Sequence, residues 1–233
     1  MQADQARMDA ISHNTANVLT PGFKRQISTS SAFSVQVAQG LDSVSASITP
    51  AQESPTQLSI DPTAGAMRPT GSPHDVAIEG PGFFEVQTAK GTFYTKLGSI
   101  RADLQGRLVV ADDVPLMGVG GELRVTNNPF TIASNGEVKQ DERVVGRLKI
   151  VNFTNPQALV PSGGGLYLAG KAQLADTRTD NTLRVGFLEG SNVSSPQEMV
   201  RLSETVRHFE SLQKVVQGYD DTLEKTIRKL GDF

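Results

Sequence analysis

The stretch Val76-Ala77-Ile78-Glu79-Gly80-Pro81-Gly82-Phe83-Phe84-Glu85-Val86 is the most informative part of this sequence about its fold. Val76 and Ile78 recur at every second position, which is the pattern of a strand with one buried face. The glycines and the proline at 80–82 favour a turn, and the aromatic and apolar residues at 83–86 favour a second strand. Two short strands joined by a turn indicate antiparallel β structure.

The same pattern continues from residue 74 to residue 190. Turn signals recur about every 8–12 residues, and Asn135-Gly136 is a strong two-residue hairpin signal. No helical pattern separates the strands to supply parallel crossovers. We therefore expect a mainly β fold with terminal α-helices, whose central antiparallel β domain (74–190) is a sandwich or a partly closed barrel. Residues 118–121 are rich in glycine but precede a strand pattern, so we interpret them as a turn and not as a phosphate-binding loop.

A long amphipathic helix is predicted in the C-terminal segment, 191–233. Ser195-Pro196-Gln197-Glu198 combines an N-cap serine, a proline at the first helical position and a capping-box glutamate. Gly231 is suited to end the helix. The apolar residues recur on average about every 3.4 residues, close to the 3.5-residue period of a coiled-coil seam. They are Met199, Leu202, Val206, Phe209, Leu212, Val216, Tyr219, Leu223, Ile227 and Leu230. Such a narrow stripe needs a partner, and we expect either the N-terminal helix or neighbouring copies to cover it.

The N-terminal segment, 1–25, is predicted to be helical over its first twenty residues and to be stopped by Pro21-Gly22. Its heptad-spaced stripe is only weakly apolar, because Asp4 and Thr15 occupy two of the seam positions. The segment 26–73 has a different composition, rich in Ser, Thr and Pro and poor in large apolar residues. We interpret it as an extended or loosely ordered connector with at most short strands.

The composition argues against several classes of function. The 233-residue chain has a net charge of −3, with 22 basic and 25 acidic residues, so a nucleic-acid binder is not expected. Cysteine is absent, which excludes disulfides, thiolate metal sites and thiol catalysis. We predict no catalytic, metal-binding or cofactor-binding residues. For His208 we expect Glu204, four residues earlier on the same helix, as the hydrogen-bond neighbour. No apolar run of about 18 residues and no secretory signal is found, so membrane insertion is not expected.

The run Asn14-Thr15-Ala16-Asn17-Val18-Leu19-Thr20-Pro21-Gly22-Phe23-Lys24-Arg25 resembles the N-terminal signature of bacterial flagellar rod and hook proteins. Four further stretches resemble motifs of that family in the family's order: 78–86, 94–109, 153–159 and 188–193. The resemblance covers nearly the whole chain except 26–73.

The resemblance implies a structural, non-enzymatic subunit that assembles through its terminal helices into the axial shaft that transmits torque. In this family the helices form a coiled-coil layer, and the subunits are exported unfolded by the flagellar type III apparatus without a cleaved signal. The implied partners are other copies and other rod proteins, and the implied location is the basal body in the periplasmic space. The chain length and residues 114–123 resemble the proximal rod protein more than the distal one.

The predicted assembly interface lies on both terminal segments. It consists of Met8, Ile11, Asn14, Asn17, Val18, Phe23, Met199, Leu202, Val206, Phe209, Leu212, Val216, Tyr219, Leu223 and Ile227. The alternatives are a distal rod or hook-type subunit, a secreted β-rich binding or adhesion module, and a hydrolase on a β scaffold.

Overall fold

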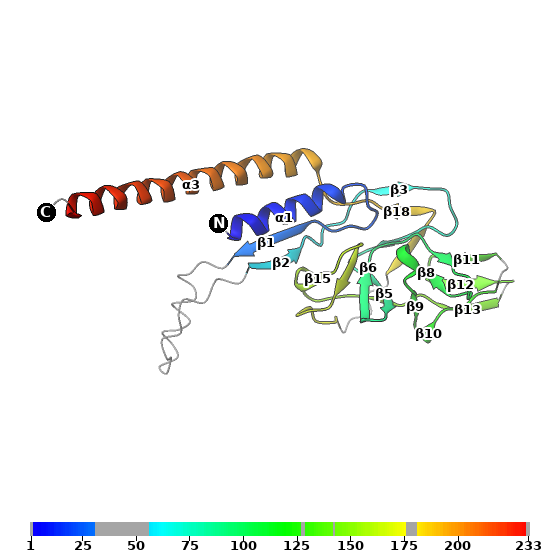
Figure 1. Ribbon diagram of the computed structural model, residues 1–233. Helices are drawn as coiled ribbons and strands as arrows, with labels where there is room; N and C mark the ends of the chain where they lie inside the picture. Colours follow the sequence, from blue (N-terminus) through cyan, green and yellow to red (C-terminus); the bar gives the residue numbers. More distant parts are fainter. Residues whose placement is uncertain (1, 31–55, 127–128, 142, 176–180, 232–233) are drawn as a thin grey trace, which may run out of the picture. The chain divides into compact units, whose positions relative to one another are not determined.

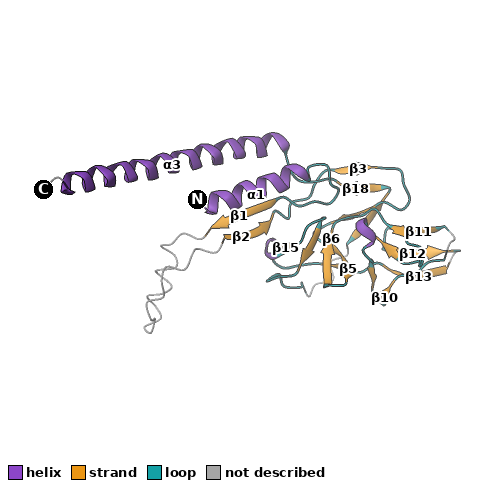
Figure 2. Cartoon of the chain, in the orientation of Figure 1, coloured by secondary structure: helices purple, strands orange, loops and turns teal. Residues whose placement is uncertain are grey.

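The computed structural model describes residues 2–30, 56–126, 129–141, 143–175 and 181–231. Short β-strands predominate, with the helices α1 (Gln2–Ala16) and α3 (Ser195–Gly231) towards the two ends of the chain (Figures 1 and 2). The predicted mainly β fold with terminal helices is confirmed. The chain divides into two compact units: unit 1 holds residues 1–13, 28–57 and 194–233, and unit 2 holds residues 14–27 and 58–193.

The described strands are short and form several small sheets. Their bounds are β1 (Gln26–Ser30), β2 (Thr56–Ile60), β3 (Met67–Pro69), β4 (Val76–Glu79), β5 (Phe83–Thr88), β6 (Gly91–Thr95), β7 (Arg101–Ala102), β8 (Leu108–Val109), β9 (Met117–Gly118), β10 (Gly121–Glu122), β11 (Phe130–Ile132), β12 (Glu137–Gln140), β13 (Arg143–Arg147), β14 (Ile150–Val151), β15 (Val160–Pro161), β16 (Leu166–Leu168), β17 (Thr182–Val185) and β18 (Phe187–Glu189).

The largest sheet has five strands in the order β14-β5-β6-β16-β15, and a three-stranded sheet has the order β11-β12-β13. The other strands form the pairs β1–β2, β9–β10, β17–β4, β18–β3 and β7–β8. Among the strands from β3 to β18, every described ladder is antiparallel, as predicted. None of the sheets that the described strands form closes into a barrel.

Two of the predicted turns join hairpin strands. Asn135 and Gly136 lie between β11 and β12, where Gly136 has a φ of +82°. The Asn135 side-chain oxygen accepts a hydrogen bond of 3.0 Å from the Glu137 N–H, which closes the turn. The glycine-rich run at 118–121 joins β9 to β10, with Gly118 paired to Gly121. It is a turn between strands, as its sequence context predicts.

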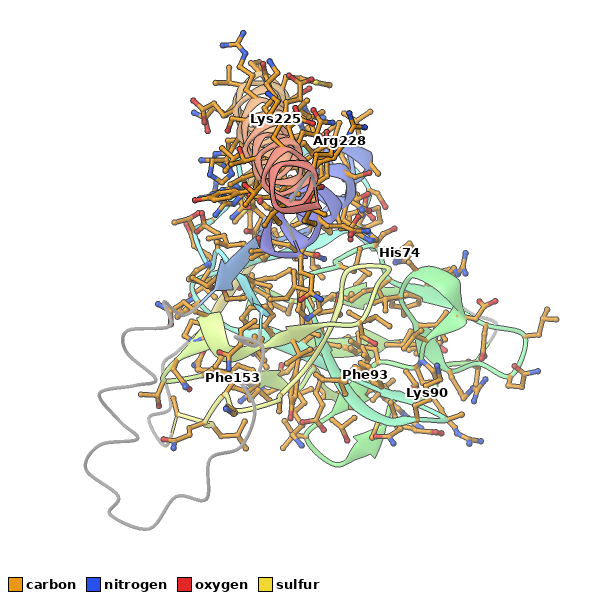
Figure 3. The ribbon with its side chains drawn as sticks, turned by 60° about the vertical axis from the view of Figure 1, so that its left-hand side comes forward. His74, Lys90, Phe93, Phe153, Lys225 and Arg228 are labelled. Carbon is orange, nitrogen blue, oxygen red and sulfur yellow. The ribbon has the colours of Figure 1, made fainter. Side chains whose placement is uncertain are left out.

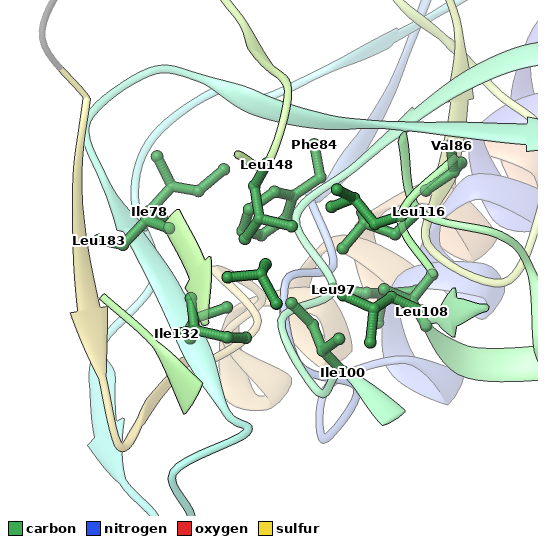
Figure 4. Packing of buried hydrophobic residues seen from close by; sticks show 14 of the residues in the cluster. Ile78, Phe84, Val86, Leu97, Ile100, Leu108, Leu116, Ile132, Leu148 and Leu183 are labelled. Carbon is green, nitrogen blue, oxygen red and sulfur yellow. The ribbon is translucent and has the colours of Figure 1, made fainter. Parts of the chain in front are cut away.

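Strand β5 of the five-stranded sheet is buried on both faces, because its neighbouring side chains point to opposite faces and meet different apolar clusters. Phe84 belongs to the larger apolar cluster, whereas its neighbour Phe83 belongs to a smaller one. Figure 4 shows the larger cluster, in which side chains from many strands point towards one another. Its members include Ile78, Phe84, Val86, Leu97, Ile100, Leu108, Leu116, Ile132, Leu148 and Leu183. The smaller cluster consists of Ile60, Phe83, Tyr94, Phe153, Leu159 and Tyr167.

The helix α1 ends at Ala16, earlier than the predicted residue 20. The Asn17 N–H bonds to the Asn14 carbonyl at 3.1 Å, and the Thr20 N–H bonds to the Asn17 carbonyl at 3.1 Å. These bonds span three residues, so the chain turns here and the α-helical ladder stops. The Asn14 side chain also binds the backbone of Gln26, which holds the following segment close to the end of the helix.

Within the predicted connector 26–73, residues 31–55 lie outside the described residues. The described part of this segment contains β1, β2 and β3, with loops between and after them. Ile60, at the end of β2, is 1% exposed and packs in the smaller apolar cluster. The described end of this segment therefore contributes to the core of unit 2.

Candidate assembly interface

Three buried charged side chains meet in unit 2 and form what we call the Lys–Glu–Lys cluster. Lys24 Nζ donates to Glu189 Oε1 at 2.6 Å, and Lys96 Nζ lies 3.4 Å from Glu189 Oε2. The three side chains are at most 3% exposed. Lys24 Nζ also donates to the Thr63 carbonyl at 2.8 Å, and Lys96 Nζ donates to the Gly80 carbonyl at 2.7 Å. The carboxylate therefore lies between two ammonium groups that are also bonded to backbone carbonyls.

The charged groups of this cluster change one another's pKa values. Burial raises the pKa of the Glu189 carboxyl, but the charges of Lys96 and Lys24 and the bonds to the carboxylate outweigh burial, so that pKa lies below its usual range. Burial lowers the pKa of Lys96 to about 8, and the attraction of Glu189 offsets this only in part. Glu189 is therefore ionised at neutral pH, and Lys96 loses its proton at a pH well below that of an exposed lysine.

The Lys–Glu–Lys cluster joins several of the stretches that resemble family motifs. Lys24 comes from the N-terminal signature, Lys96 from the stretch after β6, and Glu189 from the stretch that precedes α3. Lys96 Nζ also lies 5.5 Å from the ring centroid of Phe83, a cation–π contact with a fourth motif stretch. None of the three charged residues is in the predicted interface. Their place within matched motifs was the signal in the sequence that could have found them.

Two asparagines bind backbone groups near this cluster. Asn14 donates to the Gln26 carbonyl at 2.9 Å and accepts from the Gln26 N–H at 2.7 Å. Asn192 accepts from the Arg25 N–H at 2.7 Å and donates to the Asp61 carbonyl at 3.0 Å. Each amide satisfies both a donor and an acceptor of the main chain. The segment that follows α1 is thereby fixed to the segment that precedes α3.

Gly22 occupies a position where a side chain does not fit. Its φ is +66°, and an added Cβ would lie 2.5 Å from the carbonyl carbon of Lys96. Its N–H bonds to the Glu189 carbonyl at 2.7 Å. The glycine of the signature therefore allows the backbones around Lys24, Lys96 and Glu189 to approach one another.

Aromatic rings surround the same region. Phe83 lies 6.0 Å from Phe153 and 5.9 Å from Tyr167, both edge to face, and Tyr94 lies 4.8 Å from Phe153. The Tyr167 hydroxyl accepts a hydrogen bond of 2.8 Å from the Lys24 N–H. Burial raises the pKa of this hydroxyl. Phe153 brings in the fifth motif stretch, so all five stretches meet in unit 2.

The terminal helices α1 and α3 lie side by side in unit 1 and run in opposite directions (Figure 1). His208 Nδ1 lies 3.0 Å from Asp4 Oδ1, and the Asp4 side chain is 6% exposed. The expected neighbour of His208, Glu204, was wrong, because a shielded carboxylate on the facing helix provides the contact. Burial raises the pKa of Asp4, but the hydrogen bond and charge of His208 outweigh burial and lower it below the usual range.

A seam with steps of four and three residues runs along α3. We call it the α3 seam, and it consists of Glu198, Leu202, Thr205, Phe209, Leu212, Val216, Tyr219 and Leu223. Its positions up to 212 are buried or half-buried. Its last three positions are 49%, 69% and 59% exposed. The cover of the seam therefore stops between residues 212 and 216.

The predicted interface residues differ in how far their side chains are exposed to solvent. The buried ones are Ile11, Asn14 and Phe23. The half-buried ones are Met8, Asn17, Val18, Leu202, Phe209 and Leu212. The exposed ones are Met199, Val206, Val216, Tyr219, Leu223 and Ile227. Asn14 and Phe23 belong to unit 2 and are buried there, and the assembly role of the whole set stays a prediction. The exposed residues lie on α3.

The described residues contain neither a metal-binding group nor a membrane-spanning helix. No group of three or more His, Cys, Asp or Glu side chains among them could hold a metal ion. None of the described helices is long and apolar enough to cross a membrane.

Comparisons with known proteins place the chain in a family. The model for the C-terminal part of flagellar basal-body rod FlgEFG proteins matches residues 184–229, and the model for the D1 domain of flagellar hook proteins FlgE/F/G matches residues 77–140. The flagellar basal-body rod protein FlgG of Bacillus subtilis is 30% identical over 97% of this chain and 94% of its own length. FlgF of Escherichia coli is 33% identical over 89% of this chain and 86% of its own length. FlgF of Mesorhizobium japonicum is 30% identical over 97% of this chain and 92% of its own length.

The two family models define the class as flagellar hook and rod proteins. The chain belongs to the flagellar basal-body rod protein family, since relatives of that name are at least 30% identical over nearly all of it. The resemblance stated from the sequence is confirmed. The family assignment replaces the two alternative interpretations, an adhesion module and a hydrolase.

Proposed function

We propose that this protein is a structural subunit of the flagellar basal-body rod, which assembles with copies of itself and with other rod proteins into the shaft that transmits torque. The observation that carries the proposal is the open part of α3. We call Met199, Val206, Val215, Val216, Tyr219, Leu223 and Ile227 the exposed apolar face of α3; each of them is at least 37% exposed. A series of large apolar side chains along one helix marks a surface for a partner.

The finer features of the proposal come from the family. The terminal helices form a coiled-coil-like layer, and the β domain is a sandwich. The subunit is exported unfolded by the flagellar type III apparatus without a cleaved signal and assembles in the periplasmic space. It has no enzymatic activity. The similarity of residues 114–123 to the proximal rod protein supports a place in the proximal rod. The distal position stays the alternative, because the relatives bear two different names, FlgG and FlgF.

A matched pair of variants tests the assembly role. Leu223→Asp places a charge on the exposed apolar face, whereas Val200→Asp places one at an equally exposed position beside it, 58% against 59%. Burying a leucine stabilises an interface by about 1.5–3 kcal/mol, and a buried unpaired charge adds a further cost. Leu223→Asp should therefore prevent rod incorporation and motility, while Val200→Asp should leave both intact.

The assay is the composition of isolated basal bodies together with motility in cells that carry each variant. The purified variants should unfold at the same temperature as the wild type, since both positions are on the surface. Normal motility with Leu223→Asp would show that the exposed apolar face of α3 is not an assembly surface. Basal bodies that lack the wild-type protein would contradict the rod assignment itself.

A further inference from the structure

The strand pairs of unit 2 differ in how far apart their partners lie in the sequence. An inner group joins strands that follow one another directly: β5 with β6, β7 with β8, β9 with β10, and β11 with β12 and then β13. Phe93 of β6, labelled in Figure 3, belongs to this group. The Gln140 side chain likewise binds the backbone N–H and carbonyl of Thr126, only 14 residues away. These contacts form between residues that are close in the chain.

A second group of contacts joins the beginning of unit 2 to its end. Strand β4 pairs with β17, and β3 pairs with β18. Beyond these pairs, the Gly190 N–H bonds to the Ala66 carbonyl at 2.8 Å, and Asn192 donates to the Asp61 carbonyl, 131 residues away, at 3.0 Å. The first partner thus moves back from residue 79 to residue 61 while the second advances from 182 to 192. The contacts form one nested series between two antiparallel segments.

The outermost contacts of this series reach the segment that follows α1. The Gly22 N–H bonds to the Glu189 carbonyl at 2.7 Å, Lys24 Nζ bonds to Glu189 Oε1 at 2.6 Å, and the Arg25 N–H bonds to Asn192 Oδ1 at 2.7 Å. We call these three the closing contacts. Two of them span 165 and 167 residues, so they join the most distant parts of unit 2.

The length of the loops favours a definite order of formation. Closing a loop of chain costs conformational entropy that increases with the length of the loop. If the closing contacts formed first, the bond between Lys24 and Glu189 would close a loop of 165 residues. Once β18 has paired with β3, Glu189 lies opposite Met67, and the loop left to close runs only from residue 24 to residue 67. The inner contacts therefore make the closing contacts less costly.

The charge of Lys24 favours the same order. Its side chain is 1% exposed, and a buried ammonium group without a counter-charge is strongly unfavourable. The counter-charge is Glu189, which is the last residue of β18 and also accepts a hydrogen bond of 3.0 Å from the Gly65 N–H. Glu189 is thus held by the pairing of β3 with β18 and by the loop after β2. The segment around Lys24 has no favourable buried position until that carboxylate is in place.

We propose that unit 2 folds from its hairpins outwards and that the closing contacts form last, as a latch between the two ends of the unit. Under the same conditions, a contact that forms last in folding breaks first in unfolding. The latch is therefore the step that opens the chain before the hairpins are lost. Its link to export rests on the proposed function, in which the subunit is exported unfolded: an open latch is the first stage towards that state.

A matched pair of amide deletions in the full chain tests the order. Asn192→Ala removes long-range bonds to backbone groups, and Gln140→Ala removes equivalent bonds across 14 residues. Refolding and unfolding in urea jumps are followed by tyrosine fluorescence, since the Tyr167 hydroxyl accepts from the Lys24 N–H. Asn192→Ala should speed unfolding by about fivefold or more and leave refolding within about twofold of the wild type. Gln140→Ala should slow refolding by about threefold or more.

Pulse-labelling hydrogen exchange of the refolding wild type decides the order without any variant. Mass spectrometry should show the amides of residues 130–148 protected before those of residues 22–25 and 189–192. Simultaneous or reversed protection, or a refolding rate that Asn192→Ala slows as much as Gln140→Ala does, would overturn the proposal. These measurements use the purified chain, so such a result leaves the rod assignment intact. Absence of the protein from basal bodies would contradict the proposed function and leave the folding order unchanged.

Discussion

Replacing Glu189 by Gln removes the negative charge from the Lys–Glu–Lys cluster while keeping the shape of the side chain. Lys24 and Lys96, which are 1% and 3% exposed, would then face each other without a counter-charge. Removing one partner of a buried ion pair typically costs about 3–5 kcal/mol. Domains are commonly stable by about 5–15 kcal/mol, so the expected loss is a large part of the total.

The loss should also depend on pH in a defined direction. Without Glu189, the Lys96 ammonium group loses the attraction that partly offsets its burial, so it should release its proton more readily than in the wild type. Once Lys96 is neutral, a single buried cation remains. The difference in unfolding free energy between Glu189→Gln and the wild type should therefore be largest near pH 6 and smaller near pH 8.

Urea unfolding followed by tyrosine fluorescence measures both effects, because the chain has no tryptophan and Tyr94 and Tyr167 pack in unit 2. Glu79→Gln is the control: Glu79 is 55% exposed, and its ion pair with Arg184 should contribute less than about 1 kcal/mol. If Glu189→Gln were as stable as the control within about 0.5 kcal/mol, the cluster would not stabilise the fold and the reasoning would be refuted.

The wild type should become more stable as the pH rises from about 8 to 9.5, because unfolded Lys96, with its ordinary pKa of 10.5, keeps a proton that the folded form has released. The gain should be about 2 kcal/mol in urea unfolding, and Lys96→Met should abolish it. Gly22→Ala should destabilise the protein by roughly 2 kcal/mol or more, since alanine is strained at a φ of +66° and its Cβ would meet backbone atoms. Gly218→Ala is the control at an exposed site of α3, where an added Cβ would meet no atom within 4 Å, and it should stabilise the helix by up to about 1 kcal/mol. Equal melting temperatures for the two variants would contradict the packing around Gly22. Asn14→Ala should cost about 1–3 kcal/mol in thermal unfolding, because it removes the side-chain partner of the partly buried Gln26 N–H and carbonyl, and an unchanged melting temperature would show that water replaces the amide.

Local signals in the sequence were sufficient where neighbouring residues determine the structure. Asn135-Gly136 predicts its hairpin because the turn needs a positive φ at the glycine and a side-chain acceptor at the asparagine. Residues 83–86 predict a strand, and they lie in β5, where Phe83 and Phe84 belong to different apolar clusters. The helix α3 ends at Gly231, as its sequence predicts.

Contacts between distant residues could not be predicted in this way. Lys24 and Glu189 are 165 residues apart, and their place in the motif stretches, not the spacing or charge of their neighbours, is what distinguishes them from surface charges. The partner of His208 is 204 residues away, so counting four residues back along the same helix gave Glu204 in place of Asp4. The early end of α1 has the same cause, because the bonds from Asn14 to Gln26 depend on how the chain folds back. The stripe of α3 was predicted from its spacing, but which of its residues are covered depends on how α3 packs against α1, which the spacing does not show.

The pairing of Gly22 with Glu189 and of Arg25 with Asn192 bears on how this protein can change over evolution. Unit 2 consists of residues 14–27 and 58–193, and these bonds tie its first segment to its last. Strands and loops inserted between these segments do not alter the spacing of the two ends. Unit 2 can therefore gain or lose loops between residues 58 and 187 without a change in the sequence of either helix. Selection can act on these loops and on the helices separately.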